Sequence, residues 1–156
     1  MTDAAVKPGT IEVDEIFPHA PEILWRTLVT GDLIGRWLME PKGFAPVVGN
    51  RFTFQTTPAG AWNGVIQCEV LEVVPQQRFV FSWKGGDEGN TGYGSRLDTV
   101  VTWSLAPVKN GTRFRVVHSG FELPRNETAF RNMGEGWKKI AGRVGPLADE
   151  EGKKNA

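Results

Sequence analysis

One apolar stripe near the C-terminus constrains the fold more than any other feature of the sequence. Large apolar side chains recur there at spacings of three and four residues, the period of a helix with one buried face. The stripe consists of Phe130, Met133, Trp137, Ile140, Val144 and Leu147. It predicts a helix from about Asn126 to Leu147, with Asn126 as N-cap and Pro124 ending the preceding strand. Such a helix needs a second layer on which to pack.

The upstream sequence predicts that this second layer is an antiparallel sheet. Alternating apolar and polar residues indicate strands, and two short apolar patterns indicate helices. The predicted strands cover Thr10–Phe17, Phe44–Val48, Arg51–Thr56, Asn63–Val74, Arg78–Lys84, Leu97–Leu105 and Thr112–Gly120, and the helices cover Pro21–Val29 and Asp32–Leu38. Asn110-Gly111 predicts a hairpin turn, and a change of apolar phase near Val70 predicts a β-bulge. The expected fold class is therefore α+β.

Length predicts one globular domain, and the balanced charge does not indicate a charged partner. We expect the domain to cover residues 10–150, with flexible ends at 1–9 and 151–156. Lys plus Arg and Asp plus Glu number 18 each, so charge gives no reason to expect a nucleic-acid or membrane partner. Residues 1–9 carry no apolar run of the signal-peptide type, and no stretch is long enough to span a membrane. We therefore expect a cytoplasmic protein.

Few residues in the sequence have the chemistry of a catalytic site. Phosphate-binding glycine loops, paired metal-binding histidines and nucleophile elbows are absent. The single Cys68 excludes an internal disulfide and a cysteine-based zinc site, and we expect no metal and no cofactor. His19 precedes a helix and is interpreted as a surface residue. His118 shares a strand face with Phe114 and Val116, where it is either a hydrogen-bonded histidine at the sheet edge or a ligand contact.

The aromatic residues are the main indication of a binding site. Six Trp and nine Phe either fill a large core or line an apolar pocket. Both interpretations stay open for Trp37, Trp83 and Trp137, whereas Trp62 is placed at the rim of a pocket. The candidate ligand-binding residues are Trp37, Phe54, Trp62, Phe81, Trp83, Thr99, Val101, His118, Phe130, Met133 and Trp137.

Small residues and glycines predict where such a pocket has room and where it opens. Gly134, Gly136 and Ala141 separate the large side chains of the C-terminal helix and leave a gap between helix and sheet. The loop Gly85–Arg96 contains five glycines, so we expect it to be mobile and to border the mouth of the pocket.

Several short segments resemble one family when they are read in series. They are P-E-I-L-W at Pro21–Trp25, D-L-I-G-R-W-L at Asp32–Leu38, G-N-R-F at Gly49–Phe52, V-P-Q-Q-R-F-V-F-S-W at Val74–Trp83, N-G-T-R-F at Asn110–Phe114, H-S-G-F-E at His118–Glu122 and G-E-G-W at Gly134–Trp137. The series resembles the START/Bet v 1-like (SRPBCC) superfamily, in the branch related to the C-terminal domain of the activator of Hsp90 ATPase. The resemblance implies a helix-grip fold, in which a curved antiparallel sheet wraps a long C-terminal helix around an apolar cavity.

Two positions depart from the pattern of that family. Asn50 stands where a second glycine is common, and Gly145-Pro146 is expected to kink or end a helix that usually runs uninterrupted.

Three functions are compatible with these features. The resemblance favours a protein that binds or carries a small hydrophobic or amphipathic molecule, as a monomer or a homodimer. One alternative is a cyclase-like or hydrolase-like enzyme that uses the same pocket with His118 as acid or base. The other is a domain that interacts with an Hsp90-type chaperone or acts in a stress response. The scarcity of acid–base groups on the predicted pocket faces favours binding over catalysis without excluding it.

Overall fold

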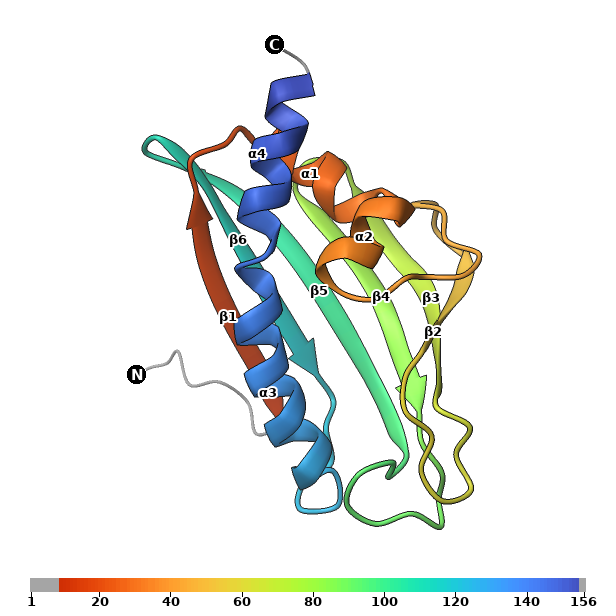
Figure 1. Ribbon diagram of the computed structural model, residues 1–156. Helices are drawn as coiled ribbons and strands as arrows, with labels where there is room; N and C mark the ends of the chain where they lie inside the picture. Colours follow the sequence, from red (N-terminus) through yellow and green to blue (C-terminus); the bar gives the residue numbers. More distant parts are fainter. Residues whose placement is uncertain (1–8, 155–156) are drawn as a thin grey trace.

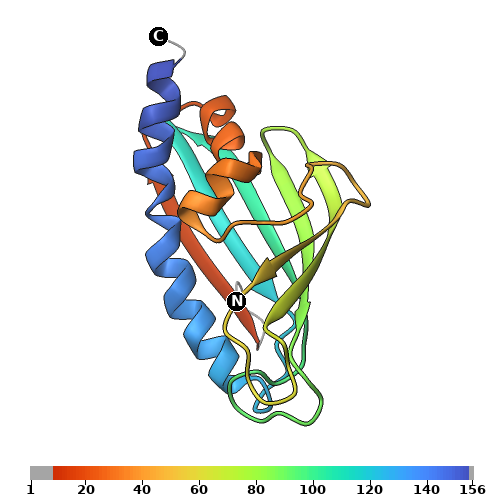
Figure 2. The same ribbon diagram turned by 45° about the vertical axis from the view of Figure 1, so that its right-hand side comes forward.

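The computed structural model describes residues 9–154, so most of the expected flexible end 1–9 and residues 155–156 of the expected flexible end 151–156 lie outside this range. The elements along the chain are β1 (Thr10–Phe17), α1 (Pro21–Val29), α2 (Gly31–Trp37), β2 (Arg51–Gln55), β3 (Val65–Val74), β4 (Arg78–Gly85), β5 (Leu97–Val108), β6 (Gly111–Ser119), α3 (Glu127–Ala141) and α4 (Val144–Lys154). All strand pairs are antiparallel, in the order β1-β6-β5-β4-β3-β2. Figures 1 and 2 show the sheet curving around α3 and α4, which confirms the predicted helix-grip fold.

The turns and irregularities of the sheet follow the local sequence. The strands β5 and β6 are joined through Asn110, whose φ of 66° suits the tight turn that Asn-Gly predicts. The register of β3 against β4 shifts between Val70 and Glu72, so the predicted bulge is present. The first strand pairs with the last, which places β6 inside the sheet and leaves β1 and β2 as its edges.

The segment predicted as a strand at Phe44–Val48 is irregular, and that prediction was wrong. The side chain of Asn50 accepts a hydrogen bond from Ala45 N at 2.9 Å and donates one to Gly43 O at 3.0 Å. These bonds hold the backbone in a loop and compete with a strand ladder. Phe44 nevertheless packs on the sheet, with its ring 5.0 Å from that of Phe52 at an interplanar angle of 85°.

The C-terminal helix is interrupted earlier than the sequence predicted. The helix α3 ends at Ala141 and α4 begins at Val144, so the break falls before Gly145-Pro146. Pro146 instead occupies the first turn of α4, where backbone N–H groups have no partner within the helix. The helix also continues past residue 150, the predicted end of the domain, to Lys154.

The helices α1, α2 and α4 cover one end of the sheet (Figure 1). Trp37 of α2 is fully buried against Trp103, with ring centroids 5.0 Å apart, and Trp103 stacks on Phe79 at 5.6 Å. Buried Glu151 of α4 contacts Arg26 of α1 at 3.2 Å, which ties these two helices together. The other half of the sheet is faced by α3 and by loops, and the cavity lies there.

Candidate ligand-binding cavity

A cavity of about 250 Å³ lies between α3 and the sheet. Its walls comprise Leu38 and Met39 after α2; Ile66, Trp83, Gly85 and Leu97 of the sheet; Thr56, Trp62, Gly86, Tyr93, Gly94 and Ser95 of the loops; and Ala129, Asn132, Met133, Gly136, Trp137 and Ile140 of α3. The α3 residues recur at spacings of three and four, because one helix face forms that wall. A side-chain Cβ at Gly136 would meet no atom within 4 Å, so this glycine leaves open space.

The structure separates the predicted ligand-binding residues into two groups. Trp62, Trp83, Met133 and Trp137 line the cavity, whereas Trp37, Phe54, Phe81, Thr99, Val101, His118 and Phe130 do not. Strand alternation identified the buried face of the sheet, but Phe54, Phe81 and Val101 are buried in the core on that face and do not reach the cavity. Phe130 packs instead on Phe121, with ring centroids 5.4 Å apart. Whether any of these residues contacts a ligand stays a prediction.

Several cavity residues were absent from the predicted set. Asn132 could have been found by extending the helical spacing one residue to the side of the large apolar stripe, and Gly136 was predicted only to leave room for the pocket. Tyr93 and Ser95 lie in the loop between β4 and β5, which the sequence did place beside the mouth. Met39 carries no local signal, because its position depends on how α2 packs.

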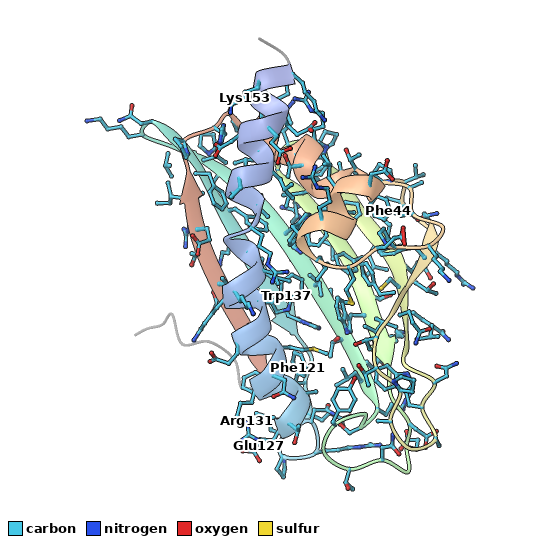
Figure 3. The ribbon with its side chains drawn as sticks, in the orientation of Figure 1. Phe44, Phe121, Glu127, Arg131, Trp137 and Lys153 are labelled. Atoms are coloured by element: carbon cyan, nitrogen blue, oxygen red, sulfur yellow. The ribbon has the colours of Figure 1, made fainter. Side chains whose placement is uncertain are left out.

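His118 lies in a closed hydrogen-bond chain behind the cavity wall. Its Nδ1 accepts from Trp137 Nε1–H at 3.0 Å, and its Nε2 lies 2.8 Å from Thr99 Oγ1, which donates to Trp83 O at 2.7 Å. Because Nδ1 is an acceptor, the neutral ring carries its proton on Nε2 and donates it to Thr99. Figure 3 shows Trp137 between α3 and the sheet. His118 is fully buried. Its strand β6 lies between β1 and β5, so the residue is not at the edge of the sheet.

Burial also fixes the protonation state of the two groups with potential reactivity. Desolvation lowers the pKa of His118 from 6.5 to about 3, so its ring is neutral at physiological pH. Both ring nitrogens are occupied, and neither is available to a ligand. Desolvation raises the pKa of the buried Cys68 thiol, which keeps it protonated. His19 lies elsewhere, with its Nε2 2.6 Å from Asp149 Oδ1.

The loop beside the mouth is tied to the start of α3 by side chains. Asn126, which is buried, donates to Ser95 Oγ and to Arg96 O, both at 2.9 Å. Asn126 was predicted as the N-cap and does precede α3, but its side chain bonds this loop and does not cap the helix. Glu88 contacts Arg125 at 2.8 Å and Arg96 at 2.9 Å. Hydrogen bonds from both arginines lower the pKa of the Glu88 carboxyl, and the bond from Arg125 has the larger effect.

The cavity wall is almost entirely apolar. Within residues 9–154 no Asp, Glu, Lys, Arg or His lines it, and its non-aromatic polar side chains are Thr56, Ser95 and Asn132. The indole of Trp62 donates to Val65 O at 3.0 Å, and the hydroxyl of Tyr93 donates to Thr57 O at 2.7 Å. In the same range no cluster of three or more His, Cys, Asp or Glu is positioned to hold a metal ion. Over the described part of the chain, none of the helices combines the length and apolarity needed to cross a membrane.

A curved antiparallel sheet that encloses a cavity against a C-terminal helix defines the helix-grip class of proteins. Within that class, the chain belongs to the Activator of Hsp90 ATPase homolog 1-like protein family, whose model matches residues 18–144. The match confirms the family predicted from the short segments.

Solved structures agree with this assignment. Protein MLL2253 from Mesorhizobium loti is 34% identical, with 90% of this chain and 97% of that chain covered and a TM-score of 0.76. Protein CV1439 from Chromobacterium violaceum is 23% identical, with 90% and 97% covered and a TM-score of 0.66. The Aha1 dimer from Colwellia psychrerythraea is 19% identical, with 87% and 92% covered and a TM-score of 0.65. The last two likenesses show the fold alone. A comparison with curated proteins gives no significant match.

Proposed function

We propose that this protein binds a small, uncharged, largely apolar molecule in the cavity between α3 and the sheet. The observation that carries the proposal is a cavity of about 250 Å³ whose described wall contains no charged side chain. An engineered apolar cavity of about 150 Å³ binds benzene, so the space here suits a larger molecule, such as one with two fused rings. The aromatic side chains of Trp62, Trp83 and Trp137 offer broad apolar surfaces to such a ligand.

The electrostatics of the wall support an uncharged ligand. Moving a carboxylate or ammonium group from water into an apolar site costs several kcal/mol unless an opposite charge compensates for it. The described wall offers no such charge. Burial of apolar area favours binding by about 25 cal/mol for each Å² removed from water, before the cost of association is subtracted.

The alternative functions have less support. An acid–base mechanism through His118 would need a ring nitrogen within reach of a ligand, and Trp137 and Thr99 occupy both. An interaction with an Hsp90-type chaperone rests on the description of the family, and a homodimer rests on the Colwellia psychrerythraea protein being described as a dimer. No contact among the described residues favours either over ligand binding.

Blocking the cavity at one glycine tests the proposal. We would titrate the protein with 2-acetylnaphthalene and follow the indole N–H resonances of its tryptophans by NMR. Gly136→Phe places a ring in the open space beside Gly136 and should weaken binding by roughly tenfold or more, equivalent to about 1.4 kcal/mol. Gly134→Phe is the matched control, because Gly134 is also in α3 with open space around it but does not line the cavity. Equal binding by the two variants would contradict the proposed site.

A further inference from the structure

A single buried hydroxyl lies in the apolar wall of the cavity. Ser95 is 1% exposed and lines the cavity from the loop between β4 and β5. Its Oγ is held by Asn126, the residue before α3, at 2.9 Å. The direction of this hydrogen bond determines what Ser95 offers to a ligand.

The surrounding backbone fixes that direction. Asn126 Oδ1 lies 2.8 Å from Glu122 N, and a backbone N–H only donates, so this atom must be the carbonyl oxygen. Asn126 Nδ2 lies 2.9 Å from Arg96 O, and a carbonyl only accepts, so this atom must be the amide nitrogen. The second hydrogen of the amide then points to Ser95 Oγ, which has to accept it.

Ser95 therefore keeps its own hydrogen for another partner. Among the described residues, this hydroxyl donates no hydrogen bond, and the one side-chain bond it forms is accepted from Asn126. Buried hydroxyl groups in proteins usually have their hydrogen-bonding capacity satisfied, so an unused donor in a cavity wall fits an acceptor on a bound molecule. Asn126 orients the oxygen, and Ser95 is the group that would touch the ligand.

We propose that Ser95 donates a hydrogen bond to a neutral acceptor oxygen of the ligand, so that the cavity recognises an apolar molecule carrying a carbonyl or ether oxygen. This inference rests on the proposed function of the cavity. A carboxylate would fit less well, because Ser95 supplies one hydrogen bond and no compensating positive charge. The nearest cation in the sequence, Arg96, is directed to Glu88 at 2.9 Å on the surface.

Two ligands of the same shape separate this recognition from general apolar binding. 2-Acetylnaphthalene has a C=O group where 2-isopropenylnaphthalene has C=CH₂. Ser95→Ala should weaken binding of the ketone by roughly three- to tenfold, the usual range for one hydrogen bond, and leave the alkene unchanged. Ser82→Ala is the matched control, because the Ser82 hydroxyl is also buried and accepts a hydrogen bond, from Glu69 N at 3.0 Å, but Ser82 does not line the cavity, so its loss should affect neither ligand.

A measurement on the unaltered protein keeps the test independent of how the variant folds. The C=O stretch of bound, ¹³C-labelled 2-acetylnaphthalene should lie at lower frequency than in hexane, because a donated hydrogen bond weakens the C=O bond. A hexane-like frequency, or equal loss of both ligands in Ser95→Ala, would overturn the role of Ser95 while leaving the cavity site intact. Failure of the unaltered protein to bind either ligand would overturn the proposed function itself.

Discussion

Trp137 of α3 donates its indole N–H to Nδ1 of His118 in β6 at 3.0 Å, and this bond joins the cavity wall to the sheet behind it. It uses the only acceptor of the neutral imidazole, and Thr99 occupies the other ring nitrogen. The indole that lines the cavity is thus positioned by a residue that does not line the cavity itself. The ring of His118 supports the cavity wall by positioning Trp137.

Acid should destabilise the protein through His118. Its pKa is lowered from 6.5 to about 3 in the fold, so the unfolded chain binds the proton more readily. The free energy of unfolding should therefore fall as pH decreases below 6.5, by up to about 1.4 kcal/mol per pH unit, until pH 3. Urea unfolding at pH 7, 6 and 5 measures the slope, which should be reduced in His118→Gln. An unchanged slope in His118→Gln would show that other groups cause it.

Removing the indole donor should change the titration of His118. Trp137→Phe leaves Nδ1 without its partner, which costs about 1–3 kcal/mol of stability and raises the pKa of His118, because Nδ1 is freed to take a proton. An NMR titration of the imidazole measures that pKa. Trp103→Phe is the control, since the buried Nε1 of Trp103 has no hydrogen-bond partner within the described residues. Equal pKa values of His118 in the two variants would contradict the role of the bond.

The sequence predicted the fold because its signals were local. The strand at Thr10–Phe17 and the helix at Pro21–Val29 match β1 and α1 in both bounds. The error at Phe44–Val48 arose from Asn50, whose side chain bonds the backbone of the preceding loop. The alternation of apolar residues in the sequence does not reveal a hydrogen bond between a side chain and the backbone.

The site was less predictable, because it depends on which half of the sheet the helices cover. Trp37 and Trp83 carry the same kind of signal in the sequence. α2 packs Trp37 into the core, whereas Trp83 lines the cavity. The polar link from Asn126 to Ser95 joins residues 31 positions apart, and only the tertiary structure brings them together.

Alanine in place of the two glycines of α3 should make the protein more stable. Gly134→Ala and Gly136→Ala should each stabilise the protein by about 0.5–1 kcal/mol, because alanine favours the helix and the added Cβ meets no atom within 4 Å. Thermal unfolding measures this gain. Gly145→Ala in α4 should gain less, since its Cβ would lie 3.0 Å from Phe17 Cε1. A loss of stability in Gly136→Ala would show that the space beside α3 is not open.

The ion pairs of Glu88 should restrain the loop Gly85–Arg96 at the mouth of the cavity. Glycines favour a mobile loop at Gly85–Arg96, but Glu88 joins it to Arg125 ahead of α3 at 2.8 Å. Glu88→Gln removes the charge and keeps the shape, so backbone amides of the loop should exchange with solvent faster than in the unaltered protein. High salt should produce the same change in the unaltered protein, because exposed ion pairs are screened.

Glu72→Gln is the matched control for this experiment. Glu72 also forms an exposed pair, with Arg78 at 2.8 and 2.7 Å, but on β3 and β4 and outside the cavity wall. Its loss should leave amide exchange in the loop unchanged. If Glu88→Gln and Glu72→Gln give the same exchange rates there, the ion pairs of Glu88 do not restrain the loop. The hydrogen bonds from Asn126 to Ser95 and Arg96, from Asn90 to Ala59 and from Tyr93 to Thr57 would then be the contacts that hold the loop beside the cavity.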